Sequence, residues 1–129
     1  RPPRSTLFPY PTLFRSKGIE HTVLITDSFV SEASPAAAFQ HVEDLVFDES
    51  GQLSGSKLTM NVACRNIMAH THCGITEAFI MASLNPAKVI GMESEIGSIA
   101  CGKAANLVFV DDRFEVSQVI LGGEIWKDE

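Results

Sequence analysis

The sequence predicts an α/β protein in which a strand and helices come first and antiparallel strands follow. A continuous apolar run at residues 23–25, two of them β-branched, is typical of a strand buried on both faces, as in a parallel sheet. Apolar residues recur at helical spacing between Leu58 and Ile67. From residue 97 the pattern changes to short β-rich runs separated by turns. This order indicates the end of a larger α/β unit followed by part of a separate small β domain.

The composition suits one soluble globular domain. The 129 residues are 45% hydrophobic and carry 16 acidic and 10 basic side chains, for a net charge of −6. These values exclude disordered, collagen-like and disulfide-dense chains, and the negative charge disfavours nucleic-acid and anionic-membrane partners. The three cysteines, Cys64, Cys73 and Cys101, form no CxxC pair and no secretory signal is visible, so we expect reduced thiols in a cytoplasmic protein.

Residues 1–16 differ from the rest of the chain. They hold four of the six prolines and three basic residues but no acid, so residues 17–129 carry a net charge of −9. We interpret residues 1–16 as a non-native or disordered leader that is foreign to the fold, with a native proline-rich arm as the alternative.

Between the first strand and the tail, the sequence predicts helices. Residues 29–55 are expected to be loop-like, with a strand pair at 38–47 and a turn at 48–51. A helix is predicted to begin at Ser56 as N-cap and to end at Gly74. A second helix follows from Thr76, with residues 75 and 80 as a hydrophobic staple.

The remaining elements follow from proline and glycine positions. Residues 85–86 are expected to restart a short helix that Gly91 ends. Strands are predicted at 106–110 and 115–121, and residues 122–123 form a hairpin signal that leads into 124–126.

Asp27 is the sharpest candidate for chemistry. It follows the carboxyl end of the predicted buried strand, where open sheets and barrels place active groups, and could serve as a general base or a metal ligand. The alternative is a turn cap that bonds backbone N–H groups. The string Leu53, Ser54, Gly55 and Ser56 leads into the predicted helix, whose N-terminus could bind an anion or polar substrate; a plain N-cap is the alternative.

Other polar residues carry weaker signals. Cys64, His70, His72 and Cys73 point around one helix rather than converge, so we do not expect a zinc site there. Residues 70–72 match an HxH metal motif but follow a helix instead of lying on a strand. Arg65 could be an exposed ion pair or a buried anchor. His21 and His41 have no identifiable partner, and four methionines are interpreted as core filler: Met60, Met68, Met81 and Met92.

Several strings together carry a resemblance to a known family. Residues 24–28 (LITDS), 51–60 (GQLSGSKLTM), 65–66 (RN) and 81–87 (MASLNPA) resemble the N-acetylglucosamine-6-phosphate deacetylases of the amidohydrolase superfamily. Residues 97–99 (GSI) and 102–108 (GKAANLV) are shared by many members of that superfamily. The likeness covers about residues 17–129.

The resemblance implies a metal-dependent (β/α)₈ TIM barrel with a small β-sandwich domain. Because such a barrel needs roughly 250 residues, this chain would be a C-terminal fragment. Residues 17–95 would be the last barrel strand, the substrate loop and the following helices, and residues 96–129 would be C-terminal strands of the small domain. In the family, a divalent metal, commonly zinc, activates water for hydrolysis of the sugar acetamide to glucosamine 6-phosphate and acetate.

Residue roles also follow from the resemblance. Asp27 matches the catalytic aspartate, which takes a proton from the metal-bound water and delivers it to the leaving amine. Leu53, Ser54 and Gly55 match a loop that contacts the phosphorylated amino sugar. The metal ligands match no residue here, so we expect no activity from this chain alone. The resemblance also allows the complete enzyme, of which this chain would be a fragment, to be a homo-oligomer.

Two other functions stay open. The first is a different amidohydrolase, for example one acting on cyclic amides. The second is a non-catalytic binding or assembly module made of the helices and the terminal hairpin.

Overall fold

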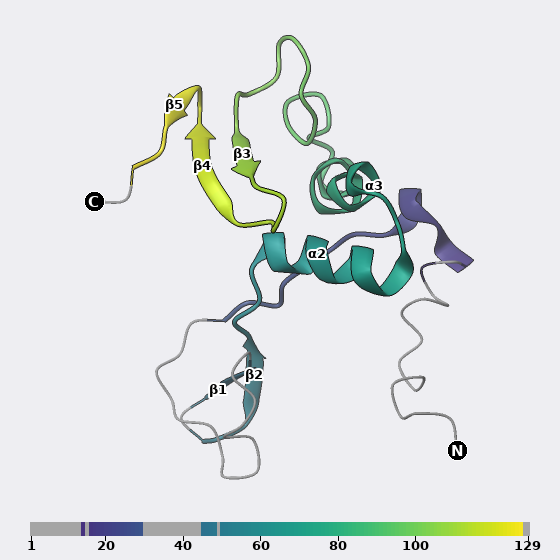
Figure 1. Cartoon of the computed structure of the whole chain (residues 1–129), viewed down its shortest axis with the longest axis vertical. Helices are drawn as coiled ribbons and strands as arrows, with labels where there is room; N and C mark the ends of the chain where they lie inside the picture. Colours follow the sequence, from purple (N-terminus) through teal and green to yellow (C-terminus); the bar gives the residue numbers. More distant parts are fainter. Residues whose placement is uncertain (1–13, 15, 30–44, 49, 128–129) are drawn as a thin grey trace.

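The computed structural model describes residues 14, 16–29, 45–48 and 50–127. Two small antiparallel sheets lie on either side of a helical centre (Figure 1). The elements described below are, in chain order, a 3₁₀ turn η2 (Ile19–His21), strands β1 and β2, helices α2, α3, η4 and α4, and strands β3, β4 and β5. No helix in the described part of the chain is long and apolar enough to cross a membrane.

The predicted buried strand at residues 23–25 is wrong for this structure. The segment lies outside every named strand, and the side chains of Val23 and Ile25 are 38% and 72% exposed. A strand buried in a parallel sheet needs a paired strand on each side. In the segment itself the Leu24 N–H donates to Met81 O (3.0 Å), and just beyond it a parallel bridge joins Ser28 to Ser56.

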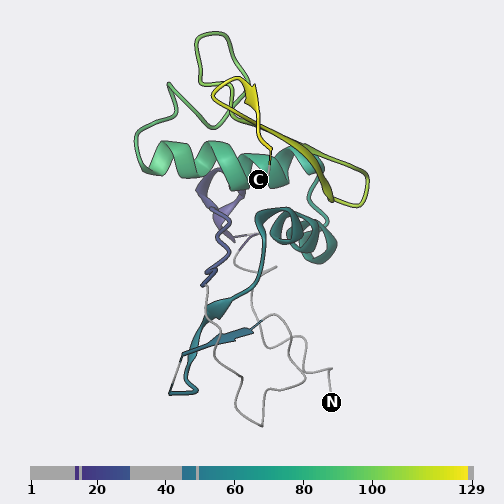
Figure 2. The same cartoon turned by 90° about the vertical axis from the view of Figure 1, so that its left-hand side faces the viewer.

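Strand β1 (Leu45–Phe47) pairs antiparallel with β2 (Leu53–Ser56), and the hairpin extends away from the helices (Figure 2). The predicted turn at 48–51 is confirmed, since the Asp48 carboxylate accepts hydrogen bonds from the Ser50 and Gln52 N–H groups at 2.8 and 2.9 Å. The expected partner region at 38–44 lies outside the described residues.

Helix α2 (Met60–Thr71) has its N-cap three residues later than predicted. Ser56 is the last residue of β2, and Thr59 occupies the N-cap position. The C-terminal stop is also not Gly74: the helix ends at His72, which adopts a left-handed conformation with φ of 60°. A left-handed residue after the last turn is a common helix terminator, although glycine is the usual choice.

Gly74 instead caps the next helix, α3 (Ile75–Phe79). Its N–H donates to the Glu77 carboxylate at 2.7 Å. This cap position places Cys73, not Ile75, immediately before the cap, so the predicted staple between Ile75 and Ile80 has the wrong register.

Helix α3 continues through a π turn, η4 (Ile80–Leu84), into α4 (Asn85–Val89), and the three form one rod in Figure 2. The predicted short helix is confirmed, since α4 begins at Asn85 with Pro86 in its first turn, but it continues from η4 without the expected break. Pro86 lacks an N–H and its ring would clash with the carbonyl four residues earlier. The π turn accommodates it, because the Asn85 N–H reaches back five residues to Ile80 O. The predicted end at Gly91 is confirmed: its φ is 71°, just beyond the last helical turn.

The C-terminal strands agree with the sequence. Strands β3 (Leu107–Val110), β4 (Val116–Leu121) and β5 (Glu124–Ile125) form an antiparallel sheet in the order β3–β4–β5. Gly122 and Gly123 turn between β4 and β5 with φ values of 61° and 89°, as a two-residue hairpin requires.

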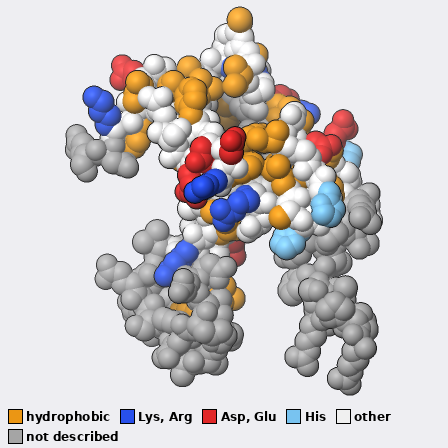
Figure 3. Space-filling view, viewed as in Figure 1, with side chains coloured by type: hydrophobic (Ala, Val, Ile, Leu, Met, Phe, Trp, Pro, Cys, Tyr) orange, Lys and Arg blue, Asp and Glu red, His pale blue; other side chains and the backbone are white. Residues whose placement is uncertain are grey.

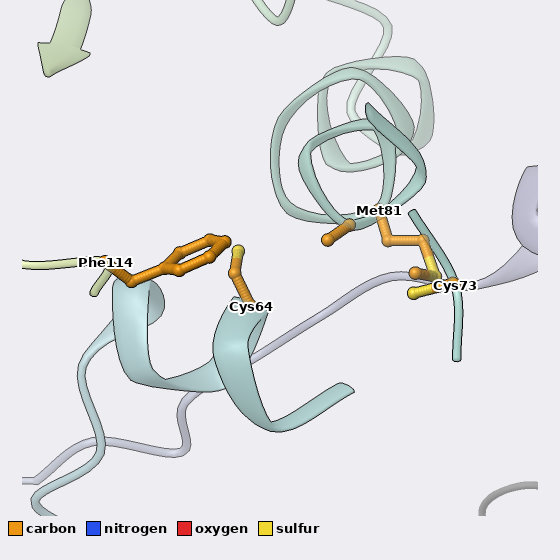
Figure 4. Close-up of a cluster of buried hydrophobic side chains, with 5 residues drawn as sticks. Cys64, Cys73, Met81 and Phe114 are labelled. Atoms are coloured by element: carbon orange, nitrogen blue, oxygen red, sulfur yellow. The ribbon is translucent and has the colours of Figure 1, made fainter. Parts of the chain in front are cut away.

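The main core cluster joins α2, the helical rod and the β3–β4 turn. It consists of Cys64, Cys73, Ala78, Met81 and Phe114 (Figure 4), and Phe14, Ile19 and Leu24 are among the residues that pack against it. The filler role is confirmed for Met81, which is fully buried, and for the half-buried Met68. Met60 and Met92 are exposed, so that prediction is wrong for them.

Candidate functional site

Asp27 lies at the end of the extended segment that follows η2. Its φ is 50°, a left-handed conformation that is uncommon for residues other than glycine, although aspartate tolerates it better than most. The residue is exposed, and its carboxylate accepts no hydrogen bond from the described residues. The alternative of a turn-capping carboxylate therefore has no support, because the bonds that hold Asp27 run through its backbone.

Strand β2 supplies those bonds. The Ser56 N–H donates to Asp27 O at 2.8 Å, and the Phe29 N–H donates to Ser56 O at 3.1 Å. The Ser56 hydroxyl donates to Thr26 O at 2.6 Å. Residues 22–29 are called the Asp27 segment below. Its residues 26–29 and the end of β2 lie side by side, although almost thirty residues separate them in the sequence (Figure 1).

Gly55 makes this approach possible. A Cβ at this position would lie 2.6 Å from Asp27 O and 2.9 Å from the Phe29 Cβ, distances that real side chains do not reach. Gly55 is buried, Ser54 is half-buried and Leu53 is 62% exposed. The structure thus brings Asp27 into contact with the strand that carries the predicted substrate residues.

The prediction that residues 53–56 lead directly into a helix N-terminus is wrong. These residues form a strand, and Lys57 and Leu58 separate them from the Thr59 cap of α2. Their backbone groups pair with β1 and with the Asp27 segment, and are not the free N–H groups of a helix N-terminus.

The cysteines and histidines of α2 and of the residues just after it face different surroundings. Cys64 and Cys73 lie in the apolar core, whereas His70 and His72 are exposed. Burial, with a smaller contribution from Cys73, raises the pKa of the Cys64 thiol and favours its protonated form. In the part of the chain that the structure describes, no group of three or more His, Cys, Asp or Glu side chains could hold a metal ion.

Two further open interpretations are resolved in part. Arg65 is exposed, so it is not a buried anchor. His21 is also exposed and lines a shallow pocket of about 320 Å³ next to α4. His41 lies outside the described residues.

Two structurally important polar residues were missed by the sequence reasoning. Ser56 was assigned to a helix cap instead of to the contact with Asp27. Asn85, only 3% exposed, donates its amide hydrogens to Ile19 O and Thr22 O at 2.6 and 2.7 Å and so fixes the start of the Asp27 segment against the helical rod. Its occurrence next to Pro86 in a helical pattern was the available signal.

An open carboxylate at the end of an extended segment, braced by a neighbouring strand, is an arrangement suited to acid–base chemistry. Residues 17–126 match the model of the amidohydrolase family. The chain belongs to this family.

Within this family, the chain is similar to several individual proteins. The chain is 34% identical to the N-acetylgalactosamine-6-phosphate deacetylases of Escherichia coli O157:H7 and of Shewanella sp. strain ANA-3, over 82% and 87% of its own length. It spans 30% of each of those proteins, and 68% of a relative from E. coli K12 that is also 34% identical.

The chain is also similar to solved structures of deacetylases. The chain is similar to the N-acetylglucosamine-6-phosphate deacetylase of Pasteurella multocida, with a TM-score of 0.77 at 25% identity over 92% of this chain. The enzyme of that name from Thermotoga maritima gives 0.70 at 26% identity over 89%. The chain covers 33% of each of these structures.

Proposed function

We propose that this chain forms the carboxyl-terminal part of a deacetylase that hydrolyses the acetamide of an N-acetylated amino-sugar 6-phosphate. The names of the relatives support this substrate class, and they include both the glucosamine and the galactosamine epimers. The observation that carries the proposal is the contact between Asp27 and Gly55, which joins the proposed acid–base group to the proposed sugar-binding strand.

The proposed domain assignment follows from the exposed surfaces. Residues 17–95 would supply the last strand of a (β/α)₈ barrel, the substrate loop and the helices after it. The backbone of residues 22–27 is extended, which suits a strand that pairs with neighbours. The exposed Val23 and Ile25 side chains would be covered when the rest of the barrel packs on both faces of that strand. Residues 96–129 would supply strands of a small β-sandwich domain, consistent with the three-stranded sheet.

Asp27 is proposed to move the protons of the reaction. Amide hydrolysis requires a water oxygen to attack the acetyl carbon, after which the bond to the sugar nitrogen breaks. The carboxylate would first accept a proton from the attacking water and would then donate it to the leaving amine. Leu53, Ser54 and Gly55, on the strand that contacts the Asp27 backbone, would position the sugar.

The amidohydrolase family generally depends on divalent metal ions, and zinc is the metal that the sequence resemblance implies. The described residues do not fit such a site, because no three candidate ligands converge. The proposed role of Asp27 is therefore limited to proton transfer, and metal ligands would have to come from outside the described residues. A phosphorylated sugar substrate and three free cysteines are consistent with a cytoplasmic enzyme.

The proposal is tested by acetate release. The DNA upstream of the Lys17 codon is sequenced, and the longest open reading frame that contains residues 17–129 is expressed. Its protein is called the long product and is compared with the 129-residue chain. We expect the long product to release acetate from N-acetylglucosamine or N-acetylgalactosamine 6-phosphate when a divalent metal is present, and the 129-residue chain to release none. Acetate from the short chain alone would contradict the fragment assignment. Activity of the long product on cyclic amides only would contradict the substrate class.

A further inference from the structure

We propose that Ser56 is a positioning residue that fixes the backbone from which the Asp27 carboxylate projects. This inference rests on the proposed function, in which Asp27 transfers protons. It concerns a residue that the sequence assigned to a helix cap and whose hydroxyl instead faces the Asp27 segment.

Ser56 holds both sides of Asp27 at once. Before it, the serine hydroxyl donates to Thr26 O at 2.6 Å. At Asp27 itself, the Ser56 N–H donates to the carbonyl at 2.8 Å, and beyond it the Phe29 N–H donates to Ser56 O at 3.1 Å. One residue therefore ties three positions of the segment, with Asp27 in the middle.

The backbone fixes the point and the direction from which this side chain projects. No described residue donates a hydrogen bond to the Asp27 carboxylate, so its placement depends on the Cα–Cβ bond that the left-handed φ of 50° orients. That conformation persists only where the surroundings fix it, since it costs a non-glycine residue free energy. Gly55 provides the space and Ser56 provides the bonds. A proton-transfer group held this way loses its alignment when the backbone relaxes, and a 1 Å misplacement costs about 100-fold in rate.

Ser56 also has a structural role that the experiment must separate. Its hydroxyl oxygen accepts the Leu58 N–H at 3.1 Å, just before α2. Loss of the hydroxyl could therefore alter the approach to this helix as well as the Asp27 segment. Threonine keeps the hydroxyl and is the conservative variant. Ser117 in β4, whose hydroxyl donates to Phe109 O at 3.2 Å, offers a matched strand serine in the other sheet.

The first experiment compares Ser56→Ala, Ser56→Thr and Ser117→Ala in the long product. We expect Ser56→Ala to lower kcat by about 100-fold. We expect little change in KM, because the hydroxyl holds the Thr26 carbonyl and is not one of the proposed sugar contacts. We expect Ser56→Thr to recover most of the loss and Ser117→Ala to match the unmodified enzyme. An unchanged kcat in Ser56→Ala, an equal loss in Ser117→Ala, or a rise in KM alone would overturn the proposal.

The second experiment measures amide hydrogen exchange in the long product. We expect the Phe29 and Ser56 amides to exchange faster in Ser56→Ala than in the unmodified chain, while amides in α2 keep their rates. Uniform acceleration across α2 would assign Ser56 a structural role only and would overturn the proposal. If the unmodified long product releases no acetate, the proposed function fails. If it is active and Ser56→Ala is equally active, the role of Ser56 fails alone.

Discussion

Gly55 lies at the closest approach between strand β2 and the Asp27 segment. It does not need a positive φ, unlike seven other glycines of the chain. Its requirement is steric, since any Cβ would overlap the Asp27 carbonyl. The glycine of the Leu-Ser-Gly-Ser string is thus explained by backbone proximity to the carboxylate residue.

Gly55→Ala is expected to destabilise the chain by about 1–3 kcal/mol, the range for overpacking a filled site. The added methyl group must push the Asp27 carbonyl or the Phe29 side chain away. Urea unfolding of the long product measures the loss, and faster exchange of the Phe29 amide locates it. Gly74→Ala is the control, because Gly74 also has a negative φ and only the Glu77 carboxylate lies near, at 3.7 Å. An equal loss in both variants would contradict a specific contact at Gly55.

At the residue scale, the sequence singled out Asp27 and residues 53–55 as candidates, and the structure places Gly55 against Asp27, but Ser56 was misassigned. Serine favours helix caps and also occurs in strands, and the choice here depends on Thr26, thirty residues earlier in the chain. Such a distant bond leaves no local pattern.

Among the elements, those formed by residues close together in the sequence were predicted best. The β4–β5 hairpin and the 48–51 turn depend on neighbouring residues, and both agree with the sequence. The strand at 23–25 depends on partners distant in the sequence, and within the described residues the segment pairs only through the bridge at Ser28. The π turn at Ile80–Leu84 was missed because a proline in a helical pattern ordinarily indicates a break.

The loop after α4 is fastened to the helical rod through Gly97. Its φ is 86°, and a Cβ there would lie 2.6 Å from the Ala87 Cβ and 2.9 Å from Ser83 O. Lys103 also ties the loop, since its ammonium group donates to Ser98 Oγ at 2.7 Å and to the Glu93 carbonyl.

Gly97→Ala is therefore expected to cost more than a left-handed alanine alone. Gly102 provides the matched control, because its φ is 87° and no atom lies within 4 Å of a Cβ. Gly102→Ala should cost about 1–2 kcal/mol from the backbone conformation, and Gly97→Ala about 1–3 kcal/mol more from the steric overlap. Urea unfolding of the two variants in the long product, followed by the circular dichroism signal of the helices, measures the difference. Equal losses would show that the loop does not pack on α4 through Gly97.

At the scale of the molecule, much apolar surface faces solvent. Figure 3 shows hydrophobic side chains over the helices and the C-terminal sheet. The most exposed large side chains include Ile99 at 88% and Val89 at 75%, together with Ile25, Leu53 and Trp126. A chain that packs only part of its apolar surface is expected to associate with other molecules.

We therefore expect the isolated 129-residue chain to self-associate and to unfold with low cooperativity. Light scattering during a calorimetric melt measures both properties in one experiment. A monodisperse species with a sharp, reversible transition would instead favour an independent binding or assembly module over part of a larger enzyme.

The central claim is that Asp27 transfers the protons of amide hydrolysis, and Asp27→Asn in the long product tests it most directly. The amide keeps the size and the backbone bonds of Asp27 but cannot accept the proton. We predict that acetate release falls by about 10²–10⁴-fold, while metal content and the folded circular dichroism spectrum stay unchanged. Retained turnover would contradict the claim, and loss of metal together with turnover would identify Asp27 as mainly a metal ligand.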